Sequence, residues 1–371
     1  MSIKNQKNYL LMGGIVLLMP IYAHAKHEKP VHMVVATINT GINPTEIAIT
    51  PNGRFAYVVN GNNNVLPGED SVSVLDLHNN LPSQTITDVS FNGLQSIAIN
   101  PAGTKAYVTN NSDNGTTVSV IDIATNQVTT TIDGFDGPSY IVINAAGNRA
   151  YVSNYGSFVG VGKGNGTTVS VVDLNSNAII GNPIEVGMAP NVLLLSPNGT
   201  SLYVLNYGDG NEGTGSMSIV QTNTDTVFDA INGFSGPSGI VVNGRYAYVT
   251  NAGNGTDQIG SSVSVVDLQN RVITESIEVG LQPSDIAISL DRRYLYVTNY
   301  NTTMSGEDFT ELTAGQGTVS IINTRTNMVV APTILVGQSP KAIVLSRDGR
   351  YAYVSNYTSN TVDVIQLSKC R

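Results

Sequence analysis

The sequence predicts an all-β fold, a seven-bladed β-propeller with four antiparallel strands in each blade, and three observations support this prediction. The pattern Tyr-Val-x-Asn recurs seven times at intervals of 44 to 57 residues, which is the length of a propeller blade. The 371 residues include 37 glycines and only 12% charged residues, a composition typical of extended β proteins. The N-terminal end of the repeat region carries one extra strand, and the C-terminal end lacks one, so the two ends together make one complete repeat. The seven copies of the pattern begin at Tyr57, Tyr107, Tyr151, Tyr203, Tyr248, Tyr296 and Tyr353.

Each repeat begins with two strands that a tight turn joins. A Gly-x-x-Pro segment such as 41–44 precedes a short apolar run, here 47–49, which predicts an inner strand buried on both faces. Pro51-Asn52-Gly53 follows, and its glycine supplies the positive φ that a tight hairpin needs. The chain then reverses into a second strand, which carries the Tyr-Val-x-Asn pattern.

Two more strands complete each repeat. Alternating apolar and small polar residues, as in 71–76, predict a third strand. A polar turn then leads to a Thr-rich outer strand such as 128–132. Four antiparallel strands repeated radially are the blades of a propeller.

The two ends of the chain predict how the ring closes. The seventh repeat stops after its third strand, 361–367, whereas an unpaired outer strand, 34–39, precedes the first repeat. Pairing the two would cover edges that are otherwise exposed. We therefore expect residues near 36 to lie beside residues near 364, within one propeller domain over 34–369 that follows a short tail, 26–33.

Residues 1–25 have the features of a secretory signal peptide. Lys4 and Lys7 form a basic start, residues 10–22 are apolar, and residues 23–25 supply an Ala-x-Ala cleavage site. The apolar stretch is too short for a membrane-spanning helix. We expect an exported protein, periplasmic or extracellular at the cell surface, with no integral membrane segment after cleavage.

Charge and cysteine content restrict the partners. The formal net charge is −9, and the loss of two leader lysines makes it −11, which argues against nucleic acid. The single cysteine, Cys370, near the C-terminus, predicts an incidental free thiol in a monomer, with an intermolecular disulfide as the alternative.

The repeat pattern resembles a known family. Tyr-Val-Thr-Asn begins at Tyr107, Tyr248 and Tyr296, and Tyr-Val-Ser-Asn begins at Tyr151 and Tyr353. These segments are similar to the YVTN β-propeller repeat family over residues 34 to 367. The resemblance implies the propeller fold of a larger group that includes quinoprotein amine dehydrogenases and lactonase-type propellers. The family includes archaeal surface-layer proteins and many exported bacterial proteins.

Function is expected where the blades differ. A residue that recurs in every blade solves a packing problem that every blade has, so the tyrosines are interpreted as fillers between sheets and the asparagines as partners of the turn backbone. The loops after Tyr-Val-x-Asn vary in length and should lie on one face, around the channel mouth. On this face the aromatic candidates for ligand binding, expected to be exposed, are Tyr155, Phe158, Tyr207 and Tyr300.

Two further groups of candidates belong to this face. The loops are acidic, and Ca²⁺ prefers oxygen ligands, so Asp209, Glu212, Glu307 and Asp308 form a weak metal candidate beside the simpler interpretation of a solvated acidic surface. The inner strands begin with small polar residues in most blades. Four residues that break this pattern are candidate ligand-binding residues near the channel entrance: Glu46, Tyr140, Asp285 and Lys341.

Three functions remain open, and the first is favoured. It is an exported, non-catalytic scaffold that binds a protein, peptide or glycan through the variable loops, without a cofactor. The second is a structural component of the cell surface. The third is a hydrolase or lactonase-like enzyme with a carboxylate or metal site at the channel mouth, where Glu46 and Asp285 could pair. The absence of Trp and of a channel-facing histidine argues against the third function.

Overall fold

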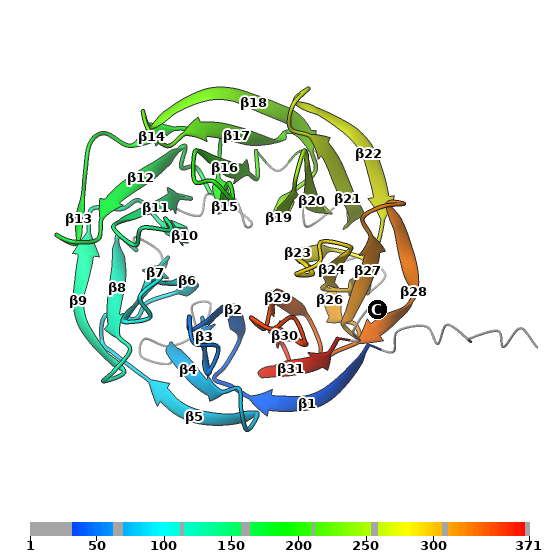
Figure 1. Cartoon of the computed structure of the whole chain (residues 1–371), viewed down its shortest axis with the longest axis horizontal. Helices are drawn as coiled ribbons and strands as arrows, with labels where there is room; N and C mark the ends of the chain where they lie inside the picture. Colours follow the sequence, from blue (N-terminus) through cyan, green and yellow to red (C-terminus); the bar gives the residue numbers. More distant parts are fainter. Residues whose placement is uncertain are drawn as a thin grey trace, which may run out of the picture.

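The structure, a computed structural model, describes residues 32–61, 70–111, 115–156, 164–209, 211, 213–253, 259–305 and 311–367. These residues form seven antiparallel sheets arranged radially around a central channel (Figure 1). Each sheet is four strands across, and the first runs β2-β3-β4-β5 from the channel outward. The predicted seven-bladed propeller is confirmed.

The two inner positions of each blade hold the strands predicted from the Gly-x-x-Pro and Tyr-Val-x-Asn segments. The innermost strands are β2 (Pro44–Ile49), β6 (Leu94–Ile99), β10 (Pro138–Ile143), β15 (Pro190–Leu195), β19 (Pro237–Asn243), β23 (Pro283–Ile288) and β29 (Pro340–Leu345). The second strands are β3 (Phe55–Asn60), β7 (Lys105–Asn110), β11 (Arg149–Asn154), β16 (Ser201–Asn206), β20 (Tyr246–Gly253), β24 (Tyr294–Asn299) and β30 (Tyr351–Asn356).

The two outer positions hold the alternating strand and the Thr-rich strand. The third strands are β4 (Ser71–Asp76), β8 (Thr117–Asp122), β12 (Thr168–Asp173), β17 (Gly215–Gln221), β21 (Ile259–Asp267), β27 (Thr318–Asn323) and β31 (Thr361–Gln366). The outer strands are β5 (Leu81–Ile86), β9 (Gln127–Asp133), the split pair β13 (Ala178–Ile179) and β14 (Ile184–Glu185), β18 (Thr226–Phe234), β22 (Val272–Glu278), β28 (Met328–Leu335) and β1 (Met33–Asn39).

The ring closes as the two chain ends predict. Strand β1 pairs antiparallel with β31, and Ala36 lies opposite Val364. The Thr37 hydroxyl donates a hydrogen bond of 2.6 Å to the Asp363 carboxylate across this pair. Asp363 stands where the other blades have serine in their third strand, so the closing blade carries a side-chain link of its own.

The core lies between the blades. The described residues form seven buried clusters, each shared by two neighbouring sheets. Tyr57 of the first blade, for example, packs against Ile97 and Val108 of the second. All seven repeat tyrosines belong to such clusters, which confirms that they fill the space between sheets.

Some of these tyrosines also form a hydrogen bond to the next blade, among them Tyr151, whose hydroxyl donates to Asp225 at 3.5 Å. The hydroxyls of Tyr57 and Tyr248 donate to Asn126 and Asn327, at 2.5 and 3.2 Å. Each asparagine lies in the turn before an outer strand and has a positive φ. For Tyr107, no hydroxyl partner is found within the part of the chain that the structure describes.

This difference provides a matched pair of substitutions. We expect Tyr57→Phe to lower the free energy of unfolding by about 1 kcal/mol, because it leaves the Asn126 side chain without its donor. Tyr107→Phe, at the same position of the next blade, should cost clearly less. Urea unfolding followed by circular dichroism measures both, and equal costs would contradict a role for the Tyr57 hydroxyl.

The prediction that the repeat asparagines bond to the turn backbone holds in part: the side-chain oxygens of Asn110 and Asn154 each accept a backbone N–H at 3.4 Å, but the side-chain amides bond mainly to hydroxyl groups. The Asn60 side-chain amide donates to the hydroxyls of Ser71 and Ser73, at 3.1 and 2.9 Å. Asn60 lies directly opposite Ser71 in the β3–β4 ladder, so its side chain points along the same face as these hydroxyls. A Cβ on Gly41 would lie only 2.6 Å from the Asn60 amide nitrogen, which explains the glycine of Gly-x-x-Pro.

Burial of the inner strands also differs from the prediction. In β2, Glu46, Ala48 and Ile49 are half-buried, whereas the second strand β3 is buried from Ala56 to Asn60. One edge of the innermost strand faces the channel, whereas the second and third strands have a strand of the same sheet on either side.

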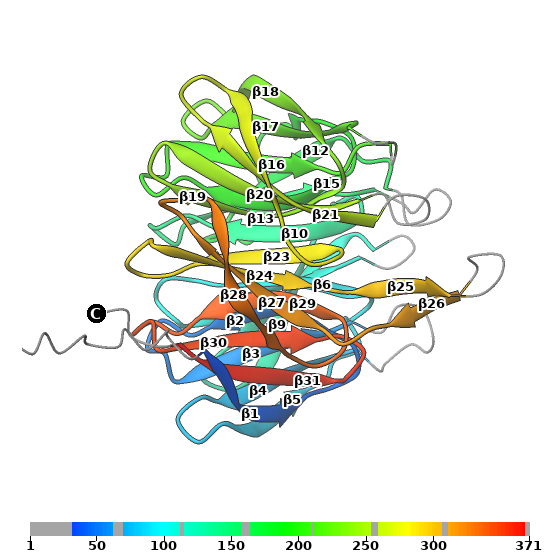
Figure 2. The same ribbon diagram turned by 90° about the vertical axis from the view of Figure 1, so that its right-hand side faces the viewer.

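One connection between second and third strands contains its own hairpin. In the sixth blade, β25 (Thr302–Ser305) pairs with β26 (Glu311–Ala314). Figure 2 shows this hairpin projecting from one side of the ring. We call this side the loop face, because the connections between second and third strands start here.

Candidate functional site

Every innermost strand carries a β-bulge where it starts on the loop face. In β2, Pro44 lies opposite Asn60 and Glu46 opposite Val59, so the inner strand has one extra residue. A corresponding register shift occurs in the other six blades. A bulge bends the strand and changes the direction of its side chains. The residues next to the bulge are the ones that differ between blades.

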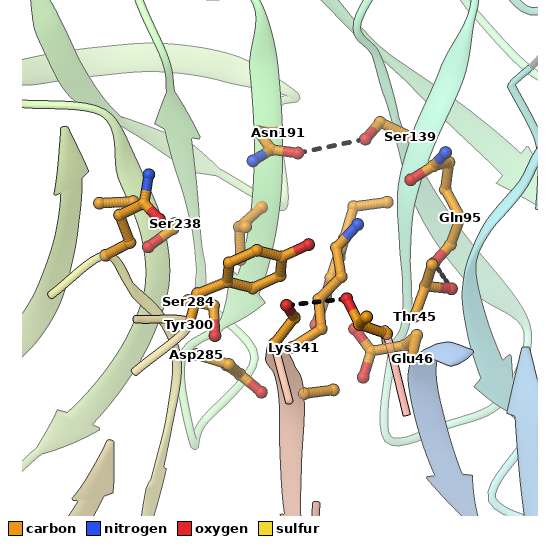
Figure 3. A pocket seen from close by; sticks show the side chains of 17 residues that line it. Thr45, Glu46, Gln95, Ser139, Asn191, Ser238, Ser284, Asp285, Tyr300 and Lys341 are labelled. Carbon is orange, nitrogen blue, oxygen red and sulfur yellow. Dashed lines mark hydrogen bonds between the residues drawn. The ribbon is translucent and has the colours of Figure 1, made fainter. Parts of the chain in front are cut away.

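These residues line a pocket of about 640 Å³ at the mouth of the channel, to which all seven blades contribute. Figure 3 shows Tyr300 and Lys341 reaching into it, with Glu46 and Asp285 in the lower part of the view. We call this the channel-mouth pocket. Its lining residues are Thr45, Glu46, Gln95, Ser139, Tyr140, Asn191, Val192, Ser238, Ala252, Gln282, Ser284, Asp285, Tyr300, Ser339, Lys341, Ala342 and Thr358.

The structure therefore brings Glu46, Tyr140, Asp285 and Lys341 together, as expected from their positions at the starts of inner strands. Their role in ligand binding stays a prediction. Sequence reasoning missed the amides of Gln95, Asn191 and Gln282 in the same pocket. The signal that could have found Gln95 and Asn191 was their position directly after the first residue of an inner strand.

Asp285 is held by the backbone of two blades. One carboxylate oxygen accepts the Ile286 N–H at 2.8 Å, and the other accepts the Ile343 N–H of the next inner strand at 2.9 Å. Burial nevertheless raises the pKa of Asp285 to about 7, although both N–H bonds favour the charged form. The carboxyl group thus links the sixth blade to the seventh.

Glu46 is the second carboxyl group of the pocket. Burial is the main cause that raises the pKa of Glu46 to about 8, and the charge of Asp285 adds to it. The Ile47 N–H, at 3.1 Å, the charge of Lys341 and a hydrogen bond with Tyr140 oppose the shift. The pKa of Tyr140 is raised well above its usual value, first by burial and then by the charges of Glu46 and Asp285.

Lys341 is the cation of the pocket. Burial lowers the pKa of its ammonium group, and Glu46 partly opposes this. The ammonium nitrogen lies 5.2 Å from the ring centroid of Tyr357. The ring centroids of Tyr357 and Tyr300 are 6.5 Å apart. Two carboxyl groups thus share the pocket with one ammonium group, and burial moves all three toward their neutral forms.

The aromatic loop residues do not behave alike. Tyr300 is half-buried and lines the pocket, whereas Tyr155 is only 7% exposed. Tyr207 is half-buried, and its hydroxyl donates to the Gly253 carbonyl at 3.0 Å. The expectation that these three tyrosines are exposed is wrong, since one is buried and two are half-buried. Phe158 lies outside the described residues.

Of the four metal candidates, Asp209 lies within the described residues. Asp209 is exposed, and its carboxylate accepts two hydrogen bonds of 2.9 Å from Asn211. Glu212, Glu307 and Asp308 lie outside the described residues, as do Cys370 and the leader. Within the described ranges, no group of three His, Cys, Asp or Glu side chains that could hold a metal ion is found. Ca²⁺ binding stays a prediction. In the same ranges, no helix has the length and apolar character needed to cross a membrane.

Fold and pocket together define a β-propeller with a pocket, lined mostly by residues with polar side chains, at one end of its channel. No model of a known protein family matches the chain. Antigen Lp49 of Leptospira interrogans serogroup Icterohaemorrhagiae serovar copenhageni (strain Fiocruz L1-130) is 29% identical over 201 residues, which are 53% of this chain and 42% of that protein. The chain thus matches less than half the length of this relative.

Among solved structures, Kuenenia stuttgartiensis hydrazine synthase is similar over 87% of this chain and 95% of that chain, with a TM-score of 0.69 and 20% identity. At this identity the similarity shows the propeller fold alone.

Proposed function

We propose that the protein is an exported, non-catalytic binding scaffold, which takes part of a protein, peptide or glycan partner into the channel-mouth pocket. One observation carries this proposal: the positions at which the seven blades differ converge on one pocket of about 640 Å³. That volume is in the range of ligand sites in other proteins. The repeat tyrosines, which all seven blades share, lie between the sheets instead.

Export and family are parts of the same proposal. The signal-like residues 1–25 and the Tyr-Val-x-Asn repeats favour an exported member of the YVTN repeat family, in the periplasm or at the cell surface. The relative Lp49 is named an antigen, which is consistent with a surface location.

Binding is favoured over catalysis by the contacts of the carboxyl groups. Both Asp285 oxygens accept backbone N–H groups, and one of these bonds joins two blades. Glu46 accepts the Ile47 N–H and interacts with Tyr140. A carboxylate fixed in this way positions a ligand well, whereas attack on a substrate would draw Asp285 away from the bonds that hold the blades together.

The proposal predicts ligand-induced stabilisation that depends on the pocket. A set of neutral saccharides, short peptides, carboxylic acids and polyamines is tested for its effect on the thermal unfolding midpoint. At least one compound should raise the midpoint by a few degrees at concentrations far above its Kd, because it binds only the native state. Gln95→Ala and Lys341→Met should abolish the shift, since both side chains line the pocket.

Arg347→Met is the matched control. Arg347 is also a cation, but it is exposed in the turn at the opposite end of the seventh blade. This variant should respond to the compound as the wild type does. A shift that survives both pocket substitutions, or no shift with any compound, would contradict the proposed site.

A further inference from the structure

We propose that the channel-mouth pocket binds an uncharged sugar, so that the partner presents a glycan, with its hydroxyl groups between Glu46, Asp285 and Lys341 and its ring against Tyr300. This inference rests on the proposed function and selects one of its three partner classes. It is carried by the hydrogen-bonding character, the charge balance and the aromatic wall of the pocket.

The pocket offers donors and acceptors in close alternation. A carboxyl group accepts hydrogen bonds and, when protonated, also donates one, an ammonium group only donates them, and side-chain amides do both. Glu46, Asp285 and Lys341 lie in one pocket with the amides of Gln95 and Asn191. A hydroxyl group donates and accepts, so neighbouring hydroxyls of one sugar can satisfy each of these partners.

The Lys341 ammonium group has unused donors. It contacts the Tyr357 ring, and no hydrogen-bond acceptor for it is found among the described residues. The side chain is half-buried and reaches into the channel-mouth pocket (Figure 3). Three N–H donors facing the pocket favour a ligand that carries oxygen acceptors.

The charge balance disfavours a ligand with a net charge. An anion near Lys341 would also lie near two carboxyl groups, and a cation near those groups would lie near Lys341. Burial moves the pKa of each of these groups toward the neutral form, because a charge in the pocket is partly removed from water. An uncharged polar ligand avoids this desolvation cost.

Tyr300 supplies an apolar surface. Its side chain lines the pocket together with those of Ser339 and Thr358. A tyrosine presents a rigid aromatic face at a low cost in conformational entropy. The C–H groups of a sugar ring can pack against this face while its hydroxyls point to the polar side chains.

The experiment compares probes of different charge on the full mature chain. The protein is applied to an array of neutral glycans, and the best glycan is titrated by calorimetry beside trialanine, putrescine, citrate and glycine. The inference expects a neutral glycan to bind more tightly than the other four probes. Tyr300→Ala and Gln95→Ala should each weaken glycan binding at least tenfold, and Arg347→Met should leave it unchanged.

Near-UV circular dichroism tests whether each variant is folded. The Gln95 side chain forms no hydrogen bond found among the described residues, so Gln95→Ala should fold. This variant keeps the test valid if Tyr300→Ala does not fold. Tighter binding of the peptide, amine, carboxylate or amino acid at this pocket overturns the sugar inference and leaves the proposed binding function in place. If no array glycan and no other probe binds at the pocket, both fail. Glycan binding that neither substitution weakens also overturns the inference.

Discussion

Replacing Ile38 by alanine is expected to lower the free energy of unfolding by about 2–5 kcal/mol, the usual cost of truncating a fully buried aliphatic side chain. Ile38 is 2% exposed and packs in the cluster that joins the seventh blade to the first, with Val58 and Val362. The strand that carries it closes the ring, so the cavity weakens the one blade built from both ends of the chain. Urea unfolding followed by circular dichroism measures the change.

Val35→Ala is the matched control, because Val35 lies on the same strand and is 44% exposed. It should change the free energy of unfolding by less than about 0.5 kcal/mol. Similar costs for the two substitutions would show that β1 does not contribute its inner face to the core in solution.

The stability of the protein is expected to fall as the pH rises from about 5 to above 8, because of the two buried carboxyl groups. The ordinary pKa values are 4.5 for Glu46 and 3.8 for Asp285, and burial raises them to about 8 and about 7 in the folded state. The folded protein therefore keeps protons that the unfolded chain has released. This favours folding at low pH, and the contribution is lost as the pH passes through about 7 and 8.

Glu46→Gln should remove part of this dependence. We expect the variant to lose less stability between pH 5 and pH 8.5 than the wild type, by on the order of 2 kcal/mol, since each unit of pKa shift corresponds to about 1.4 kcal/mol and the two carboxyl groups titrate together. The amide still offers an oxygen to the Ile47 N–H. Chemical unfolding at several pH values measures the difference, and identical pH profiles would refute the raised pKa of Glu46.

Asp285→Asn provides a contrast at the same pocket. Both Asp285 oxygens accept backbone N–H groups, so an asparagine would place its own NH2 group against one of these donors. This variant should be less stable than the wild type at pH 5, where Glu46→Gln is expected to be close to neutral. The comparison separates the removal of a charge from the loss of an acceptor.

The sequence predicts where several pocket residues lie, but it does not predict which atoms they contact. Glu46 and Asp285 were found because they depart from the other repeats, and a residue that breaks a repeat at the start of an inner strand must lie at the channel mouth. Their partners could not be found in this way. Asp285 accepts a hydrogen bond from the Ile343 N–H, which belongs to the next blade and is 58 residues away in the sequence. The bond forms only because the closed ring places the two strands side by side.

The aromatic residues show the same limit. Tyr155, Tyr207 and Tyr300 each follow a repeat asparagine, and the sequence gives no reason to treat them differently. Their surroundings differ because neighbouring loops differ: Gly164 packs against the Tyr155 ring, whereas Tyr300 faces the open pocket. Exposure depends on which loop lies opposite, and that is a property of the assembled ring.

By itself, the sequence determined the number of blades, the order of strands in each blade and the pairing of Ala36 with Val364, because a repeated pattern with complementary ends permits one closed arrangement. Only the tertiary structure decided that the repeat asparagine bonds to serine hydroxyls, that Tyr155 is buried, and that Glu46, Asp285 and Lys341 share one pocket. The physical reason is the range of the interactions. Local patterns specify strands and turns, whereas burial, pKa shifts and hydrogen bonds between blades depend on atoms that the closed ring alone brings together.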